Sequence, residues 1–360
     1  MNQPEDGSFF APLLESYSGE GAEFLRFDAY GMGAQNVFLV AGDSETELQD
    51  AVYGGMQILD RLEERLSKFL PESDISLIND LGAHSPVHVS AELFELLEKA
   101  HQAWRLTDGA FDPTIGPLLE AWGFVDRDWR VPEQDEIARL LELRGMQHVH
   151  LDVGTQSVGL SRPGVTIDLG AIGKGYAADR IAEHLRANGA RAGAVICGRS
   201  TVVTWSTPTG EDSWSFDVVD PLKPQDSLLT LSAEPGAVSS SGAYEKCFRC
   251  GDAEYGHVFD PRTGRPVDNR VQGVTVWTRS ALLGDVLSTA LFVLGPQALQ
   301  QSGPLAELVR SWDGADSRTG FLFIESATPT DSRPGRPSQS RSESLSWSTH
   351  FWGAPSFAVC

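Results

Sequence analysis

The sequence has few cysteines and few basic residues. Its 4 cysteines in 360 residues are too few for a disulfide framework, and no second pair completes a zinc site with Cys247 and Cys250, so we expect reduced thiols. Lys and Arg number 28 against 50 Asp and Glu, which gives a formal net charge of −22. This balance argues against nucleic acid or an anionic membrane as the main partner, because binding a polyanion requires cations that neutralise phosphates.

Export and membrane signals are also lacking. The opening residues Met1 to Gly7 carry no positive segment followed by an apolar one, and nowhere do 18 apolar residues follow one another. We therefore expect a cytoplasmic protein without a membrane span. A hydrophobic content of 41% is normal for a chain that buries a full core, so disorder throughout is excluded.

The composition along the chain indicates one large domain with flexible ends. We expect a flexible leader over residues 1–22, a domain over 23–327, and a mobile Ser/Pro-rich tail over 328–360 with an aromatic patch at Phe351-Trp352. Predicted strands alternate with helices only in places and often follow one another in runs. This order favours an α+β fold with mixed and antiparallel sheets over a doubly wound parallel sheet.

Two helices have clear start signals. Ser44 with Glu47 three positions later is a capping box, and apolar residues then recur every three or four positions as far as Phe69. A second helix is predicted from Ser90 to Leu106, before the helix-breaking Gly109. A short helix is expected between Pro132 and Gly145. Predicted strands are Val37–Val40, Val149–Asp152, Val165–Leu169, Ala194–Ile196, Trp214–Val219, Leu228–Ser232, Gly273–Trp277 and Phe321–Ile324.

A glycine-rich turn joins a predicted strand to a helix. Residues 165–169 lead into Gly170-Ala171-Ile172-Gly173-Lys174-Gly175-Tyr176, and the following helix ends near Asn188-Gly189. The glycine spacing fits neither a dinucleotide fingerprint nor a P-loop. Glycines before a helix N-terminus nevertheless suit close approach by an anion, Lys174 suits phosphate, and Asp168 stands at the strand end. The alternative is a tight turn with a solvated lysine.

Two further segments carry residues suited to phosphate chemistry. Asp285 and Thr289 are four positions apart in a helical pattern, so their oxygens leave one helix face and form a half-site for Mg²⁺. They could equally be surface or capping residues. His257 precedes an Asp-Pro and Thr-Gly turn that would hold an imidazole rigidly as a base for a hydroxyl proton, although a lone His is more often structural. The loop Gly109–Pro117 carries Phe111 and Asp112, which could cup a planar ring or only stiffen a turn.

Together these segments resemble the FAD:protein FMN transferases, the ApbE flavin transferase family. Seven motifs occur in the family's order over roughly residues 30 to 325. They are Met32-Gly33; Leu66-Ser67-Lys68-Phe69 with Ser73–Asn79; Gly109–Pro117 with Trp122-Gly123-Phe124; Asp168–Tyr176; Ser241-Gly242 with Tyr244; His257–Val267; and Asp285–Thr289.

The resemblance implies an ApbE-like, T-fold-like architecture. It also implies an enzyme that uses Mg²⁺, or Mn²⁺ with the same oxygen ligands, to split the FAD pyrophosphate, move FMN onto a Thr or Ser hydroxyl of an acceptor protein, and release AMP. His257 would be the base. The implied metal ligands are the Ala171 carbonyl, Asp285, Ser288 and Thr289. The residues implied to line the FAD site are Met32, Phe69, Ala110, Phe111, Asp112, Asp168, Lys174 and Phe259.

The chain departs from the family pattern in three respects. Arg199 in Cys197-Gly198-Arg199 replaces a small or acidic residue, and Ala34 and Phe69 replace a Thr and a Tyr. Many relatives are exported or lipid-anchored, whereas no such signal is visible here, so the acceptor is expected in the cytoplasm or on the cytoplasmic face of a membrane protein. The large cation could alter acceptor docking or bind phosphate. Two alternatives therefore stay open, an FAD pyrophosphatase that yields FMN and AMP, and a flavin-binding module without turnover.

Overall fold

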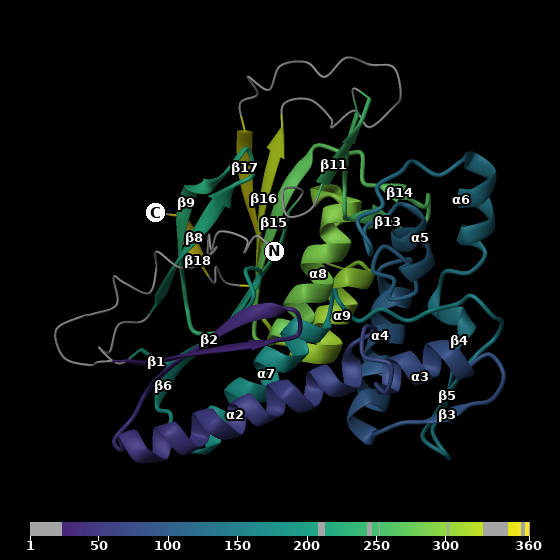
Figure 1. Cartoon of the computed structure of the whole chain (residues 1–360). Coiled ribbons are helices and arrows are strands. Elements are labelled where there is room, and N and C mark those ends of the chain that lie inside the picture. Colours follow the sequence, from purple (N-terminus) through teal and green to yellow (C-terminus); the bar gives the residue numbers. More distant parts are fainter. Residues whose placement is uncertain are drawn as a thin grey trace.

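The computed structural model describes residues 24–207, 213–242, 247–251, 253–300, 302–326, 345–353 and 357–359 (Figure 1). Its centre is an 8-stranded sheet in the order β1-β2-β6-β7-β10-β15-β16-β17. Every strand pairing in these residues is antiparallel, so the α+β class is confirmed and the pairing is less mixed than expected. The sheet strands are β1 Leu25–Gly31, β2 Ala34–Ala41, β6 Ala192–Cys197, β7 Thr201–Trp205, β10 Ala237–Gly242, β15 Val271–Thr278, β16 Thr319–Ser326 and β17 Leu345–Trp352.

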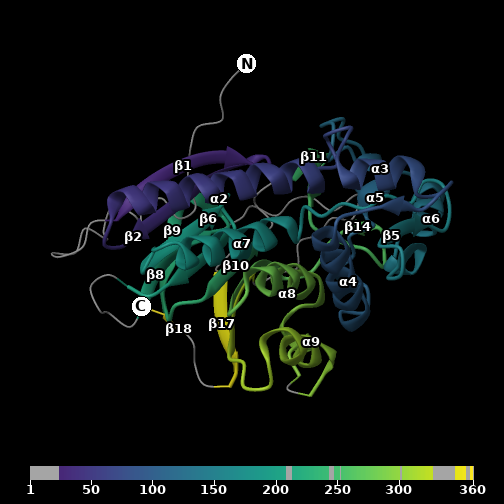
Figure 2. The ribbon, with the colours of Figure 1, turned by 90° about the horizontal axis from the view of Figure 1, so that it is seen from below.

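Helices cover one face of this sheet. Helices α2, α7 and α8 run side by side beneath it, with α4 and α9 beyond α8 (Figure 2). Among the described residues, no helix combines the length and the apolarity that crossing a bilayer requires. The helices are α2 Glu45–Leu66, α4 Ala91–Leu106, α7 Gly173–Ala187, α8 Ala281–Leu294 and α9 Pro304–Asp313.

The other face of the sheet packs on a second, three-stranded sheet of order β18-β9-β8. Side chains alternate accordingly along the central strands, because successive residues of a strand point to opposite faces. Phe38 and Val40 of β2 join the helix-side core, while Val37 and Leu39 join the cluster under the small sheet. The small sheet consists of β8 Trp214–Asp220, β9 Lys223–Ala233 and β18 Phe357–Val359.

A peripheral region lies beside the helical layer (Figure 1). Its aromatic cluster joins two segments distant in sequence, since Trp122 packs on Tyr255 and donates its indole N–H to the Gly264 carbonyl at 3.1 Å. The elements here are α3 Asp74–Leu81, β3 Val87–His88, α5 Gly116–Ala121, α6 Gln134–Leu141, η1 Met146–His148, β4 Val149–Asp152, β5 Ser157–Leu160, β11 Cys247–Cys250, β12 Ala253–Gly256, β13 Phe259–Asp260 and β14 Arg265–Pro266; η2 Pro296–Ala298 follows α8.

The helices and strands predicted from short sequence patterns are confirmed, with one exception described below. Ser44 caps α2 by accepting from the Glu47 amide, and Ser90 caps α4 by accepting from the Leu93 amide. The expected strands in β2, β4, β6, β8, β9, β15 and β16 all form. Strand β1, which pairs with β2 along its whole length, was not expected.

The predicted strand at Val165–Leu169 is wrong. The segment buries Val165, Ile167 and Leu169 but joins no sheet. The side chain of Asn79, 88 residues earlier, accepts from the Ile167 amide at 2.7 Å and donates to the Ile167 carbonyl at 3.0 Å. A side chain thus takes the place of a neighbouring strand, because a buried backbone group needs a partner but not a particular one.

The described part of the predicted mobile tail also differs from expectation. Residues 345–352 form edge strand β17 on β16, and residues 357–359 form β18 on β9. The Trp352 ring lies edge-on to Phe321 with centroids 4.8 Å apart, so the aromatic patch does anchor this segment. Residues 327–344 and the expected leader 1–22 lie outside the described residues. No disulfide joins the three described cysteines.

Candidate functional site

The first turns of α7 and α8 meet at Asp285. Its Oδ2 accepts a 2.7 Å hydrogen bond from the Gly175 amide of α7, and its Oδ1 accepts one of 2.8 Å from the Thr201 hydroxyl of β7. A Cβ at Gly175 would lie 2.4 Å from the Ala281 carbonyl oxygen and 2.8 Å from Asp285 Oδ2. Glycine is therefore required here, since any side chain would push the two helices apart.

Asp285 is a buried carboxyl group with a raised pKa. Burial is the main cause, and Lys174 with the hydrogen-bond donors around the carboxyl partly offsets it. An ionised carboxylate has room for about four hydrogen bonds or ligands, so the donors leave capacity for a cation. A cation beside the carboxylate would favour its charged form and relieve the cost of burying it.

The oxygens around Asp285 come mainly from hydroxyl groups. Thr289 follows one turn later on α8. Ser288 donates to the Asp285 carbonyl at 3.2 Å and accepts from Ser241 at 3.1 Å, so its hydroxyl already has two partners. Within the described residues, no group of three or more His, Cys, Asp or Glu could hold a metal ion. One carboxylate with hydroxyl and carbonyl oxygens fits Mg²⁺, which keeps waters and takes substrate phosphates.

Lys174 and Met32 lie at the start of α7. The Lys174 ammonium donates to the Ser200 hydroxyl at 2.5 Å, and a Cβ on Gly198 would lie 3.8 Å from its Nζ. Met32 has a positive φ of 54°, and its Cε is 3.1 Å from the place where a Cβ of Gly173 would stand. The β1–β2 turn, with Met32, and the β6–β7 turn, with Gly198 and Ser200, therefore both lie next to the N-terminus of α7, where Lys174 is. The departing residue Arg199 is exposed in one of these turns.

Asp168 ties the glycine-rich turn to two other predicted segments. Its Oδ2 pairs with the Lys68 ammonium at 2.8 Å, and its amide donates to the Pro113 carbonyl at 2.7 Å. The Lys68 ammonium also stands 5.3 Å from the centroid of the Phe69 ring, which is 71% exposed. Lys68 stands in the motif Leu66–Phe69 but is not among the residues implied to line the FAD site, and only the fold shows that it meets Asp168.

Asp112 has a buried carboxyl oxygen without a partner. Its Oδ1 accepts from the Thr114 amide at 2.9 Å and from the Thr114 hydroxyl at 2.6 Å, but its Oδ2 has no hydrogen-bond partner in the described part of the chain. Burial raises the pKa of Asp112 to about 6. Ala110 and Phe111 beside it are buried. Such an orphaned acceptor suits a ligand that donates an N–H or O–H.

His257 and Phe259 belong to a third segment. His257 directly follows β12, as expected for the end of a strand, and the Asp260 side chain and carbonyl accept from the Arg262 and Gly264 amides in the predicted turn. The Phe259 ring, however, is buried 5.6 Å from the Trp122 ring centroid. It lies in the aromatic cluster, so Phe259 can line a ligand site through its backbone only.

Most of the predicted site residues thus form two connected groups, while His257 and Phe259 belong to the third segment and to neither group. The first gathers Asp285, Lys174 and Met32 around the start of α7, and the second gathers Asp168, Phe69 and the loop at residues 110–114. The stretch from Asp168 to Gly175 connects them. Sequence reasoning missed Thr201, whose place next to Asp285 no local pattern indicates.

Known proteins resemble this chain over most of its length. The model of the ApbE family matches residues 36–304. A curated "FAD:protein FMN transferase" of Klebsiella pneumoniae (strain 342) is 35% identical over 240 residues, which are 66% of this chain and 74% of that protein. One of the same name from Vibrio cholerae is 30% identical over 267 residues, 72% of this chain and 79% of the relative.

Solved structures agree with this match. The ApbE protein of Thermotoga maritima superposes with a TM-score of 0.71 at 29% identity, covering 84% of this chain and 94% of that one. The Pseudomonas stutzeri flavinyl transferase ApbE, in its apo form, gives a TM-score of 0.69 at 27% identity, with 86% and 96% covered.

Proposed function

The chain belongs to the ApbE family, and from that premise we propose that it is an FAD:protein FMN transferase acting on a Thr or Ser hydroxyl of an acceptor protein. The observation that carries this proposal is the buried Asp285 carboxylate at the N-terminus of α7, with Lys174 as a neighbouring cation. A helix N-terminus with a lysine and a cation-binding carboxylate is suited to a diphosphate.

The reaction exchanges a phosphoanhydride bond of FAD for a phosphoester bond. The acceptor oxygen attacks the phosphorus of the FMN half, the bond from that phosphorus to the bridging oxygen breaks, and AMP leaves with that oxygen. His257 takes the proton of the attacking hydroxyl, a role suited to an imidazole near neutral pH. The new phosphoester joins FMN to the acceptor side chain.

Phosphate binding depends on local groups because the chain as a whole is acidic. Asp285, Thr289 and the Ala171 carbonyl would hold Mg²⁺ or Mn²⁺, which supplies charge neutralisation and orientation of the phosphates when bound. Lys174 adds a positive charge at the start of α7, and Ser200 holds its ammonium in place. Ser288 stays a predicted ligand, although its hydroxyl is already engaged by Ser241 and the α8 backbone.

The planar parts of FAD would lie against the second group of residues. The exposed Phe69 ring offers a stacking face, held beside Lys68. The unpartnered Oδ2 of Asp112 would accept an N–H or O–H of the dinucleotide, which gives that buried oxygen the partner it lacks. Met32 and the backbone at 110–111 complete the proposed lining.

The test is covalent transfer. The protein is incubated with FAD, Mg²⁺ and candidate acceptor proteins from its own cell, and the acceptors are analysed by mass spectrometry for the FMN increment while AMP is quantified. We expect equal amounts of AMP and flavinylated acceptor, and loss of both in His257→Ala. AMP released without regard to acceptor would instead support the pyrophosphatase, and tight FAD binding with no AMP would support the binding module. Cell fractionation would test the predicted cytoplasmic localisation.

A further inference from the structure

Helix α7 carries a second carboxylate that reaches α8. Asp179 lies one turn after Gly175, on the same face of α7. Its Oδ1 accepts from the Ala281 amide at 2.8 Å, and its Oδ2 accepts from the Leu282 amide at 2.9 Å and from the Ser280 hydroxyl at 2.8 Å. Asp179 therefore binds the first amides of α8, which a helix leaves without intrahelical partners.

The two helices exchange carboxylates. Asp179 of α7 binds the first turn of α8, and Asp285, one turn into α8, binds the Gly175 amide in the first turn of α7. Each contact places a negative charge at the positive end of a helix dipole. Two reciprocal contacts leave the first turns little freedom to slide or rotate against each other.

Asp179 does more than cap α8, because it reaches these amides from another helix, α7. Ser280, the N-cap of α8, accepts from the next amide, that of Leu283. Asp179 is also costly, because burial and the neighbouring Asp285 raise its pKa to about 7. A costly buried carboxylate that joins one helix to the first turn of another indicates a positional role.

We propose that Asp179 is a positioning residue for the metal site, an inference that rests on the proposed function. It fixes the start of α8 against α7, so that Asp285 and Thr289 are held at a set distance from the Ala171 carbonyl just before α7. The hydrogen bonds of Asp179 go to Ser280, Ala281 and Leu282 and not to the implied metal ligands. Displacements near 1 Å matter at such a site, since ligands act only when held close to their productive geometry.

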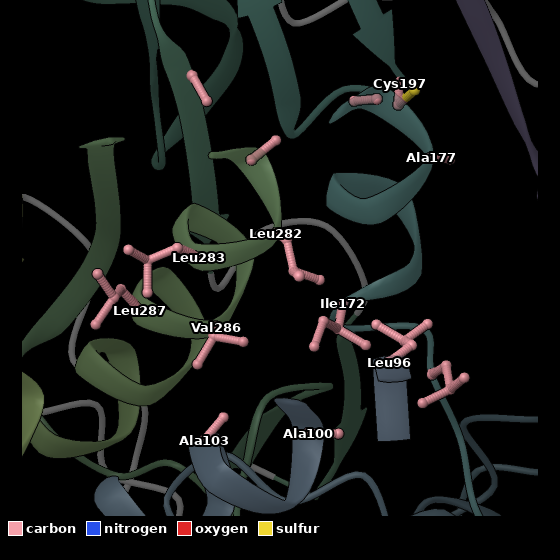
Figure 3. Packing of buried hydrophobic residues seen from close by; sticks show 14 of the residues in the cluster. Leu96, Ala100, Ala103, Ile172, Ala177, Cys197, Leu282, Leu283, Val286 and Leu287 are labelled. Carbon is pink, nitrogen blue, oxygen red and sulfur yellow. The ribbon is translucent and has the colours of Figure 1, made fainter. Parts of the chain in front are cut away.

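Apolar packing keeps the two helices folded without this contact. Leu282 and Val286 of α8 lie in one buried cluster with Ile172, which precedes α7, and with Leu96 and Ala100 of α4 (Figure 3). Replacement of Asp179 by Asn should therefore change the position of α8 relative to α7 without unfolding the helix.

The experiment measures Mn²⁺ affinity in protein free of FAD, by calorimetry or by the electron paramagnetic resonance of free Mn²⁺. In Asp179→Asn we expect affinity to fall about tenfold, as when a metal ligand loses the group that orients it. The Mn²⁺ concentration for half-maximal transfer should rise in parallel, with a smaller change in kcat at saturating metal. The matched control is Asp313→Asn, because Asp313 accepts from the Arg279 amide at 3.1 Å just before α8 but belongs to α9, so this bond does not join α8 to α7.

The outcomes separate the two proposals. Unchanged Mn²⁺ affinity in Asp179→Asn, with only a lower melting temperature, would overturn the positioning role and leave the proposed function standing. No Mn²⁺ binding by the unmodified protein, with FAD as well as without it, would overturn both. If Asp179→Asn does not fold, Asp179→Glu keeps the charge and moves it by one methylene. It should also weaken Mn²⁺ binding, and wild-type affinity in that variant would contradict the inference.

Discussion

Asp285 and Gly175 are 110 residues apart in sequence, yet the Asp285 carboxylate accepts a 2.7 Å hydrogen bond from the Gly175 amide. The contact joins the two helices that carry the predicted metal ligands. It depends on a backbone without a side chain at position 175, and this dependence can be tested directly.

Gly175→Ala should damage both folding and metal binding. The added methyl would meet the Ala281 carbonyl oxygen at 2.4 Å, and backbone cannot move aside as a flexible side chain can. We expect a loss of about 1–3 kcal/mol in the free energy of unfolding and weaker Mn²⁺ binding. The control is Gly159→Ala, where the nearest atoms lie 3.8 Å away. Equal urea midpoints for the two variants would refute the steric argument.

Asp112→Asn should change the pH dependence of stability. The carboxyl pKa is raised from 3.8 to about 6 by burial, so the folded state holds the proton more tightly than the unfolded state. The stabilisation that this proton gives is full below the unfolded pKa of 3.8 and is lost as the pH rises through about 6. The variant lacks this loss, so its stability relative to wild type should improve by roughly 2–2.5 kcal/mol between pH 4 and pH 8.

Urea unfolding at both pH values measures the effect of Asp112, and parallel pH profiles for the two proteins would contradict it. FAD titration of the same variant supplies a second result. Affinity should fall at pH 8 although the protein has become relatively more stable, because the orphaned oxygen would no longer be a charged acceptor.

Phe69→Ala should weaken FAD binding without lowering stability. The ring is 71% exposed, so its removal should change the free energy of unfolding by less than about 0.5 kcal/mol. Loss of a stacking face for a flavin or adenine ring should cost about 1–3 kcal/mol of binding. Tyr53→Ala is the control, because that ring is 65% exposed on α2 and has no predicted role. Fluorescence titration with FAD would reject the assignment if both variants bind alike.

Trp352→Ala should destabilise the protein more than Trp347→Ala. Both tryptophans are on β17, but Trp352 packs on Phe321 with centroids 4.8 Å apart, whereas Trp347 is 50% exposed. We expect a cost of about 2–3 kcal/mol for Trp352→Ala and less than about 1 kcal/mol for Trp347→Ala. Thermal unfolding would show whether β17 belongs to the cooperative core. If both variants have the melting temperature of the wild type, β17 contributes little to the stability of the protein.

Local signals predicted much of the secondary structure. Ser44 and Ser90 each bond to an amide three residues later, so their helices begin where the sequence says. The same local signals wrongly predicted a strand at residues 165–169, because the hydrogen-bond partner of this segment is the side chain of Asn79 and not a neighbouring strand. Nothing near that segment indicates a distant amide.

The site was predictable only as a set of segments. Motif order identified Asp285 and Lys174, but the pairing of Lys68 with Asp168 joins positions 100 residues apart and appears only in the fold. Phe259 is implied to line the FAD site, and the structure shows that its ring packs on Trp122. Position in a motif does not tell which way a side chain faces. Residues 345–352 carry polar residues that resemble a tail, yet their alternation with Leu and Trp suits an edge strand.

The separation of Gly175 from Asp285 sets an order of events during synthesis. Because a chain leaves the ribosome from its N-terminus, α7 emerges while α8 is still unmade, and its first amides then have no carboxylate to receive them. The proposed cation site can therefore form only after α8 has been made and has packed beside α7.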